Sequence, residues 1–415
     1  MPGAVVTAQI VQSVLPRLAI DGGTPVRTTP LPSWPQFDDA DARAAADVLR
    51  SGHVNYWTGD HGRAFESEFA RWAGVPGAVA VANGTVALEL ALRALGIGPG
   101  HEVIVPAVTF IGTASAVAAC GARPVVVDVD PDSQAMTVGT VARAITNRTA
   151  ALIVVHVGGY PADAGELAEF ARAKGLPLVE DCAQAHGACR DRRPVGRFGC
   201  IAAWSFCQDK IMTTAGEGGA ITTGDTDLYR RCWELKDHGK SWVGVHETQH
   251  PPGFRWLHDT FGTNARMTEI QAAVGRLQLA KLDGWVAQRR ARADVLRRAL
   301  GEFAALRLPA LAPGVEHSYY RFYVHLQEDR MKPGWTRDRV VAAINAEGVS
   351  AAFGGCTEIY REKAFDAVGR PAGPLLVAHW LGRHSMVLPV HPALSAMDVQ
   401  DVAEAARKVL EEASA

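Results

Sequence analysis

The feature that most constrains the fold of this chain is a regular alternation of short apolar runs with longer amphipathic segments. The runs are rich in Val, Ile and Leu and continuously apolar, which is typical of parallel strands covered on both faces by helices. We predict strands at residues 78–82, 102–106, 124–129, 151–156, 176–180, 201–206 and 220–223. Between and after them we predict helices at residues 86–95, 110–120, 138–145, 164–174 and 227–237. The expected fold class is therefore α/β.

The chain of 415 residues is long enough for an N-terminal arm and a second domain in addition to this region. Residues 1–35, rich in Pro and Gly toward their end, predict an N-terminal extension or arm, followed by a large domain over residues 36–282. A helix at 268–281 precedes a second, arginine-rich helix at 283–303, which we expect to lead into a small α+β domain over residues 283–415. In that domain we predict strands at 319–326 and 385–389 and a final helix at 398–412.

Composition excludes several classes of function. The formal net charge is −2 and no basic stripe is present, so nucleic acid is not an expected partner. No apolar run reaches the roughly 20 residues that a membrane span needs, and residues 1–18 lack the basic start of a signal peptide. The seven cysteines form no CxxC pair, which predicts reduced core thiols in a cytoplasmic protein and no metal site.

Polar and aromatic side chains stand at or just beyond the carboxyl ends of the predicted strands. In open parallel sheets these ends meet at one edge, where ligands bind. The residues are Asn83, Phe110, His156, Asp181, Ser205 and Lys210. We therefore expect a site at this edge.

Lys210 follows the strand at 201–206 and precedes a glycine-rich run, Gly216–Gly219. A lysine at such a place suits imine formation, because burial lowers the pKa of an amine and frees its lone pair. Asp181 suits a protonated pyridine nitrogen, and Gly84 and Thr85 open a helix whose free amides suit a phosphate. Taken singly, each residue also fits a turn, a cap or the core. Together they favour pyridoxal phosphate, with Ser205 on the phosphate and Phe110 stacked on the ring.

Several motifs now point to a family. They are Ala82-Asn83-Gly84-Thr85-Val86-Ala87-Leu88, Pro106-Ala107-Val108-Thr109-Phe110, Glu180-Asp181-Cys182-Ala183-Gln184-Ala185-His186-Gly187-Ala188, Ser205-Phe206-Cys207-Gln208-Asp209-Lys210 and Phe261-Gly262-Thr263-Asn264-Ala265-Arg266. In this order and spacing the chain closely resembles the DegT/DnrJ/EryC1/StrS sugar aminotransferases from about Leu18 to Leu410. The resemblance implies the fold-type I architecture of pyridoxal-phosphate transferases, with a mostly parallel seven-stranded sheet.

The resemblance also implies roles for particular residues. Lys210 would hold the cofactor as an imine and shuttle the proton, while Asp181 would pair with the pyridine nitrogen. Gln184 would lie near the phenolic oxygen of the ring. Gly84, Thr85 and Ser205 would hold the phosphate, and Asn264 would reach it from the other subunit of a homodimer. For His156 the resemblance leaves two interpretations open, a site residue and a satisfied core histidine.

The implied reaction is transamination through pyridoxamine phosphate, from glutamate or glutamine to a keto-sugar. Related dehydratases carry histidine where this chain has Lys210, which favours transamination. We expect a nucleotide-linked keto-deoxyhexose, with Lys236, His238 and Tyr319 as candidate substrate contacts and residues 240–258 as a substrate loop. The alternatives are a cyclitol (scyllo-inosose type) aminotransferase or a 3-amino-5-hydroxybenzoate synthase-like enzyme. A non-catalytic regulatory protein that binds the cofactor is a further alternative, which the retention of Lys210 and Asp181 disfavours.

Overall fold

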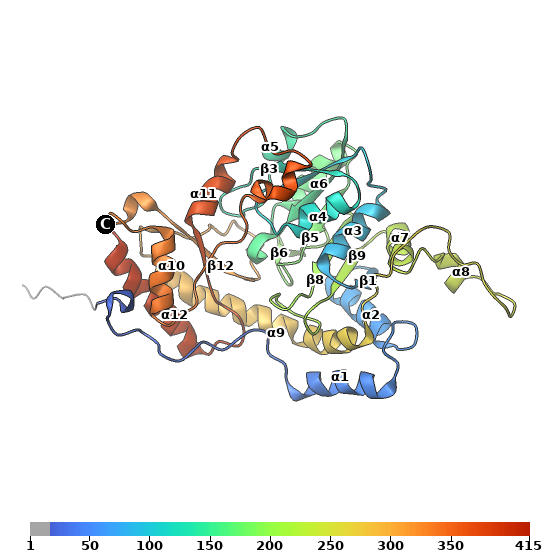
Figure 1. Cartoon of the computed structure of the whole chain (residues 1–415), viewed down its shortest axis with the longest axis horizontal. Coiled ribbons are helices and arrows are strands. Elements are labelled where there is room, and N and C mark those ends of the chain that lie inside the picture. Colours follow the sequence, from blue (N-terminus) through green and yellow to red (C-terminus); the bar gives the residue numbers. More distant parts are fainter. Residues whose placement is uncertain (1–16) are drawn as a thin grey trace, which may run out of the picture.

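The computed structural model describes residues 17–415, so residues 1–16 of the predicted extension lie outside the described residues. Its centre is a seven-stranded sheet in the order β1-β9-β8-β5-β4-β2-β3 (Figure 1). The strands are β1 (Gly77–Val81), β2 (Glu102–Pro106), β3 (Arg123–Val127), β4 (Thr149–Val155), β5 (Leu178–Asp181), β8 (Ile201–Ser205) and β9 (Gly219–Thr223). All seven predicted strands are present, with ends shifted by a few residues at most. The predicted α/β fold class is confirmed.

The strand directions bring the predicted site residues to one edge. The neighbours β3, β2, β4, β5 and β8 pair in parallel, whereas β9 runs antiparallel to both β8 and β1. The parallel strands β2, β5 and β8 are buried throughout and β3 and β4 over most of their residues, which accounts for the continuous apolar runs in the sequence. The carboxyl ends of β4, β5 and β8 therefore lie side by side.

Helices cover both faces of the sheet because successive strand residues point to opposite sides. Val79, Val103 and Ile153 point to one face and belong to a core with α3, α4 and α7, whereas Ala80 and Leu152 point to the other. The other face is covered by α2 and α9 at one end and by α5 and α6 at the other. The bounds are α2 (His61–Ala73), α3 (Gly84–Ala94), α4 (Gly112–Ala119), α5 (Val138–Ala142), α6 (Ala164–Ala173), α7 (Thr226–Lys236) and α9 (Glu269–Leu300).

The prediction of two separate helices at 268–281 and 283–303 is wrong. Helix α9 is continuous over 32 residues and passes through Asp283 and Gly284. A side chain added at Gly284 would meet open space, so this glycine lies on an exposed turn that neither kinks nor ends the helix. Thr268 begins the helix with a capping box completed by Gln271. The division into domains at 282/283 stays a prediction.

The C-terminal part of the chain has its own sheet and core. Its sheet has the order β10-β12-β14-β13, and a hydrophobic cluster joins it to the end of α9 and to Leu18. A further three-stranded sheet has the order β11-β6-β7. The strands are β6 (Cys189–Arg190), β7 (Arg193–Pro194), β10 (Leu306–Arg307), β11 (Val315–Glu316), β12 (Phe322–Leu326), β13 (Ala352–Phe353) and β14 (Ser385–Leu388). The helices are α10 (Arg337–Ala346), α11 (Leu376–His384) and α12 (Ala396–Ala413), the last confirming the predicted final helix.

Two segments lie at the periphery. The N-terminal arm runs past the C-terminal part to α1 (Asp39–Ser51), which packs on α9 (Figure 1). On the other side, α8 (Trp242–His246) and the loop after it project from the body, at the right of Figure 1. The short 3-10 helices are η1 (Ala19–Asp21), η2 (Val157–Gly159), η3 (Glu328–Arg330), η4 (Ile359–Arg361) and η5 (Lys363–Asp366). Among the described helices, none combines the length and the apolar character that a bilayer crossing demands.

Candidate active site

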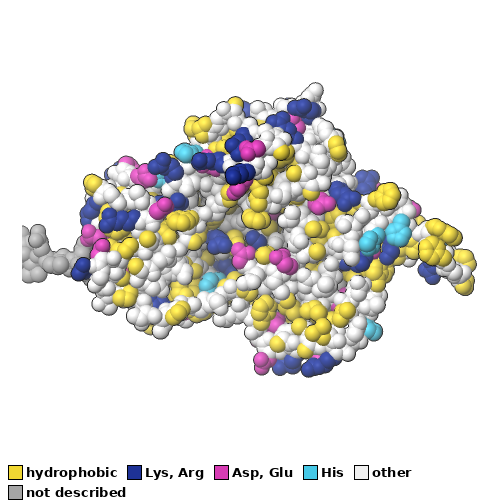
Figure 2. Space-filling model, in the orientation of Figure 1, with side chains coloured by type: hydrophobic (Ala, Val, Ile, Leu, Met, Phe, Trp, Pro, Cys, Tyr) yellow, Lys and Arg dark blue, Asp and Glu magenta, His cyan; other side chains and the backbone are white. Residues whose placement is uncertain are grey.

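A cavity of about 820 Å³ opens at the carboxyl ends of the parallel strands, between the large sheet and the C-terminal part. Figure 2 shows a hollow near the middle of the molecule with basic and acidic side chains at its margin. Six of the predicted cofactor residues line this cavity in addition to Lys210: Gly84, Thr85, Phe110, Asp181, Gln184 and Ser205. The sheet edge therefore gathers, in one chain, every predicted cofactor residue except Asn264.

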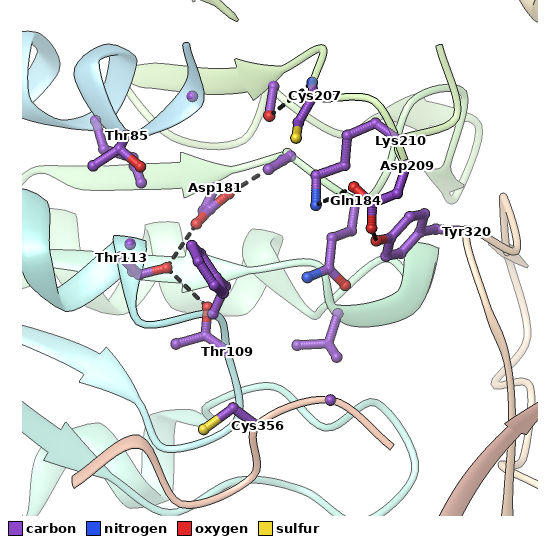
Figure 3. Close-up of a pocket in the computed structure, with 18 of the residues that line it drawn as sticks. Thr85, Thr109, Thr113, Asp181, Gln184, Cys207, Asp209, Lys210, Tyr320 and Cys356 are labelled. Carbon is purple, nitrogen blue, oxygen red and sulfur yellow. Dashed lines mark hydrogen bonds and ion pairs between the residues drawn. The ribbon is translucent and has the colours of Figure 1, made fainter. Parts of the chain in front are cut away.

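Lys210 lies in the loop between β8 and β9, whose strands pair as a hairpin. The loop is folded back on β8, because the Thr214 amide and the Thr213 hydroxyl both donate to the Phe206 carbonyl. The Lys210 side chain is mostly buried, and its Nζ lies 3.8 Å from Asp209 Oδ1 and 4.8 Å from the ring centre of Tyr320. Figure 3 shows the amine pointing into the cavity, toward the side where Asp181 lies.

Asp181 ends β5 and is 5% exposed. Its Oδ2 accepts a hydrogen bond of 2.8 Å from the Thr113 hydroxyl, which in turn lies 2.8 Å from the Thr109 hydroxyl. Its Oδ1 accepts from the Ala183 amide at 3.1 Å. Burial raises the pKa of Asp181 above its ordinary value, although the two hydrogen bonds and the charge of Lys210 act in the opposite direction. A cationic partner in the cavity would favour its charged form.

Helix α3 points its first turn at the cavity. The Asn83 side chain caps the helix by accepting from the Val86 amide. Among the described residues, none accepts from the amides of Gly84 and Thr85. A Cβ added at Gly84 would lie 2.6 Å from Cβ of Ser205, so only glycine lets the helix start approach this strand end. Free amides, a nearby hydroxyl and a helix dipole form a site for an anion.

Two further side chains line the cavity between the anion site at the start of α3 and Lys210. Phe110 is 66% exposed although it follows a buried strand, so its ring offers a face to the cavity. Gln184 Oε1 accepts from the Gly158 amide at 2.7 Å, which leaves the Nε2 group of Gln184 as a donor for the cavity. An uncovered aromatic face and an oriented amide donor suit a flat ring with an anionic oxygen.

These residues fit pyridoxal phosphate on geometric grounds. The cavity joins an anion cradle, an uncovered aromatic face, a buried carboxylate and an amine. Each would suit a different group of the cofactor, namely the phosphate, the ring face, the ring nitrogen and the aldehyde. The individual roles of Gly84, Thr85, Phe110, Asp181, Gln184, Ser205 and Lys210 remain predictions.

His156 does not line the cavity. It is fully buried at the end of β4, where its Nε2 lies 3.1 Å from Glu180 Oε2 and its Nδ1 accepts from the Ala162 amide. Glu180 also accepts from three backbone amides of residues 196–199. Both ring nitrogens of His156 are therefore satisfied, which favours the core interpretation of this histidine. Cys182 lies close to His156 and Glu180, and three such side chains could hold a metal ion. However, both carboxylate oxygens of Glu180 are already engaged in hydrogen bonds.

The candidate substrate contacts also lie outside the cavity. Lys236 is fully buried, and its Nζ donates to Glu66 Oε1 at 2.9 Å and lies 3.9 Å from the ring centre of Tyr56. His238 is exposed outside the cavity. Tyr319 is buried against His317, with ring centroids 3.9 Å apart. Its neighbour Tyr320 lines the cavity instead, so the tyrosine prediction missed by one residue.

Asn264 is exposed and lies outside the cavity of its own chain. It is bridged to Asp237, at the base of the projecting segment that carries α8. No residue of that segment, 240–258, lines the cavity either. Within one chain the predicted substrate loop and Asn264 therefore do not reach the site.

The structure adds a network that sequence reasoning missed. Asp209, next to Lys210, accepts from the Tyr320 hydroxyl and, at 3.1 Å, from Arg321 Nη2 (Figure 3 shows Asp209 and Tyr320). Although burial acts to raise it, the charges of Lys210 and Arg321 and the Tyr320 hydroxyl hold the pKa of Asp209 below its ordinary value. The position of Asp209 beside the lysine was the only sequence signal, because its partners come from a segment about 110 residues later.

Comparison with known proteins identifies the type of molecule. The family model described as "DegT/DnrJ/EryC1/StrS aminotransferase family" matches residues 35–407. A UDP-N-acetyl-3-dehydro-alpha-D-glucosamine 3-aminotransferase from Acidithiobacillus ferrooxidans is 39% identical over 86% of this chain and 90% of its own length. An L-glutamine:2-deoxy-scyllo-inosose aminotransferase from Streptomyces kanamyceticus is 36% identical over 95% of this chain and 97% of its own length. The solved structure of an aminotransferase from Psychrobacter cryohalolentis is 45% identical, covers 92% of this chain and 99% of its own, and has a TM-score of 0.90.

Replacing Lys236 with Met tests whether this lysine serves the substrate or the fold. Because Lys236→Met leaves the Glu66 carboxylate buried without its partner, we expect a loss of about 3–5 kcal/mol in the free energy of unfolding, measured by urea denaturation. The exposed Lys363→Met variant is the control and should change the stability by at most about 0.5 kcal/mol. Unchanged stability with a raised KM for the acceptor would contradict the structural role.

Proposed function

Because this chain belongs to the DegT/DnrJ/EryC1/StrS aminotransferase family, we propose that it moves an amino group from glutamate or glutamine to a nucleotide-linked keto-hexose. The protein is a pyridoxal-phosphate-dependent sugar aminotransferase. The observation that supports the amino transfer is the convergence of Lys210, Asp181 and the start of α3 in one cavity. This is the set of groups that an amino transfer requires.

Pyridoxal phosphate, when bound, supplies an aldehyde that condenses with amines and a ring that withdraws electrons from the carbon bearing the nitrogen. We assign Lys210 Nζ to hold the aldehyde. The same Nζ, when free, would act as the base that takes the proton from the amino-bearing carbon of the donor and as the acid that gives a proton back. Its loop is folded back on β8, which keeps the amine near that carbon through both transfers.

The other residues act by holding and orienting. Asp181 keeps a proton on the ring nitrogen, and Thr113 fixes the carboxylate that does so. The amides of Gly84 and Thr85 with the Ser205 hydroxyl bind the phosphate, and Gln184 Nε2 donates to the phenolic oxygen. Phe110 lies against one ring face and excludes water from it. The buried setting strengthens each of these electrostatic contacts.

The choice of acceptor rests on relatives rather than on a contact. A relative that is 39% identical carries a nucleotide sugar in its name, and one that is 36% identical over nearly the whole chain carries an inosose. Of the residues that we assigned to the acceptor, none lines the cavity of its own chain. We retain the nucleotide-linked keto-hexose as the proposed acceptor and the cyclitol as its alternative.

We further propose a homodimer with two shared sites. The projecting segment exposes Phe254 by 80%, Trp256 by 87% and the nearby Phe261 by 98%, and yellow side chains mark this projection in Figure 2. Apolar groups exposed to that extent on an arm are typical of an interface. Asn264 stands at the base of the same arm and lies outside its own cavity, so a second copy is the partner whose phosphate it would reach.

The reaction is tested in two half-reactions. We expect L-glutamate or L-glutamine to convert cofactor-loaded protein from the pyridoxal to the pyridoxamine form, followed by absorbance and by release of the keto acid. A UDP- or dTDP-linked keto-hexose should then restore the pyridoxal form. Lys210→Ala should lose both conversions, while the exposed Lys363→Ala retains them. Asp181→Asn should slow them by about 10²–10³-fold, because it removes the charge that faces the ring nitrogen.

The outcomes separate the candidate functions. Restoration by scyllo-inosose alone would move the assignment to a cyclitol aminotransferase. A wild-type protein that binds the cofactor and converts with neither donor would contradict catalysis altogether and favour a regulatory role.

Shared sites are tested by mixing two damaged chains. Lys210→Ala removes the amine, and Asn264→Asp places a negative charge where the phosphate of the partner's cofactor is expected. If Asn264 serves the other subunit, a hybrid of the two variants has one site with both native residues, so the mixture regains turnover that neither parent has. Two affinity tags allow the hybrid to be isolated and assayed. No gain in the isolated hybrid would place Asn264 in its own chain's site or outside both sites.

A further inference from the structure

A second cavity, of about 470 Å³, lies behind the lysine loop. Its walls come from the N-terminal arm, helix α9 and strand β14, and it shares Asp209, Tyr320 and Arg321 with the first cavity. Trp34, which lines it, donates Nε1 to the carbonyl oxygen of Lys210 at 2.8 Å. A space of this size falls within the range of about 300–1,000 Å³ typical of small-molecule pockets. None of the roles assigned above uses this cavity.

The cavity contains a buried charge without an ionic partner. Arg289, from α9, is 2% exposed, and its guanidinium makes no ion pair with any described residue. Residues 1–16 contain no Asp or Glu, so they offer no acidic side chain that could pair with Arg289. Nη1 of Arg289 makes only long contacts, of 3.3 Å, with the carbonyls of Tyr319 and Tyr320, and its Nε has no acceptor among the described residues. An uncompensated buried charge of this kind is costly.

The charges lining the cavity indicate the sign and the magnitude of the charge that a ligand would need to bring. Arg289 and Arg321 contribute two positive charges, and Asp209 contributes one negative charge. Asp209 is already bonded to Tyr320 and Arg321, which leaves Arg289 uncompensated. Burial lowers the pKa of Arg289 to about 9, so the guanidinium stays charged at neutral pH. Burial also lowers the pKa of His391, another lining residue, to about 4, so it is neutral there. One negative charge balances the site.

The remaining walls fit a carbon skeleton. The guanidinium carbon of Arg289 lies 5.2 Å from the ring centre of Trp34. Apolar side chains from β14 and the residues after it, including Leu388 and Val390, continue this surface. A planar guanidinium pairs with a planar carboxylate through two parallel hydrogen bonds, and an apolar wall beside it favours an attached alkyl stem over a bare inorganic ion.

We propose that this second cavity binds a small organic monocarboxylate, with its carboxylate on Arg289 and its carbon stem against Trp34. The site lies behind Lys210 and is separated from the first cavity by Asp209, Tyr320 and Arg321. The proposed binding does not depend on the proposed reaction, because it requires neither the amino donor nor the keto-sugar acceptor. The competing interpretation is that Arg289 only braces the carbonyls of Tyr319 and Tyr320.

The test uses butyrate, which has a carboxylate and an alkyl stem but no amino or keto group. We expect butyrate to bind the cofactor-loaded protein at one site per chain with a Kd in the millimolar range or tighter, measured by calorimetry, and to raise its Tm. Butyramide, of the same shape without the charge, should do neither. Arg289→Met should weaken butyrate binding at least tenfold. Without butyrate, its Tm should equal or exceed that of the wild type, because the unpaired charge is gone.

Two further variants keep the test decisive. Arg289→Lys retains the charge without the planar fork and should bind butyrate more weakly than the wild type but better than Arg289→Met. Arg298→Met removes an exposed arginine from the same helix and should bind as the wild type does. The proposal is overturned if butyrate does not bind, or if Arg289→Met binds it with wild-type affinity, which would place the anion elsewhere. It is also overturned if Arg289→Met lowers the Tm while butyrate leaves the wild type unaffected, since that result assigns Arg289 a bracing role alone.

Discussion

The buried carboxylate of Asp181 is the constraint around which the rest of the site is arranged. It ends β5, and the parallel pairing of β5 with β8 places it beside the strand that leads to Lys210. Its Oδ2 is fixed by Thr113 on α4, and the same helix follows the loop that carries Phe110. Burial makes a lone carboxylate unfavourable, so the site suits a ligand that brings a positive charge. In the function that we propose, a protonated ring nitrogen of the cofactor supplies this charge.

The lysine loop is held from two distant parts of the chain. Trp34 of the N-terminal arm binds the Lys210 carbonyl, and Tyr320 and Arg321 of the C-terminal part bind the neighbouring Asp209. The hairpin of β8 and β9 fixes the two ends of the loop. This arrangement links the position of the amine to the packing of the arm and the C-terminal part against the large sheet. It also leaves Arg289 buried behind the loop as an unpaired charge.

Sequence predicted the sheet well because each strand is a continuous apolar run, and it predicted that most of the candidate cofactor residues share one site, because parallel strand ends meet at one edge. It failed where position depends on tertiary packing. Lys236 has the charge of a substrate contact, yet α7 turns it into the core against Glu66. Tyr319 and Tyr320 are adjacent and alike in composition, and only the path of the chain decides which one faces the cavity. No local pattern marks Asp209 and its partners, which are far apart in the sequence.

In the function that we propose, one amine, Lys210 Nζ, holds the cofactor in this cavity. Reduction of the cofactor-loaded protein with borohydride fixes the cofactor on the amine that holds it, and peptide mass mapping then locates the adduct. We expect a single modified peptide with the added mass on Lys210. A reduced adduct on another lysine, or none from protein saturated with cofactor, would contradict it.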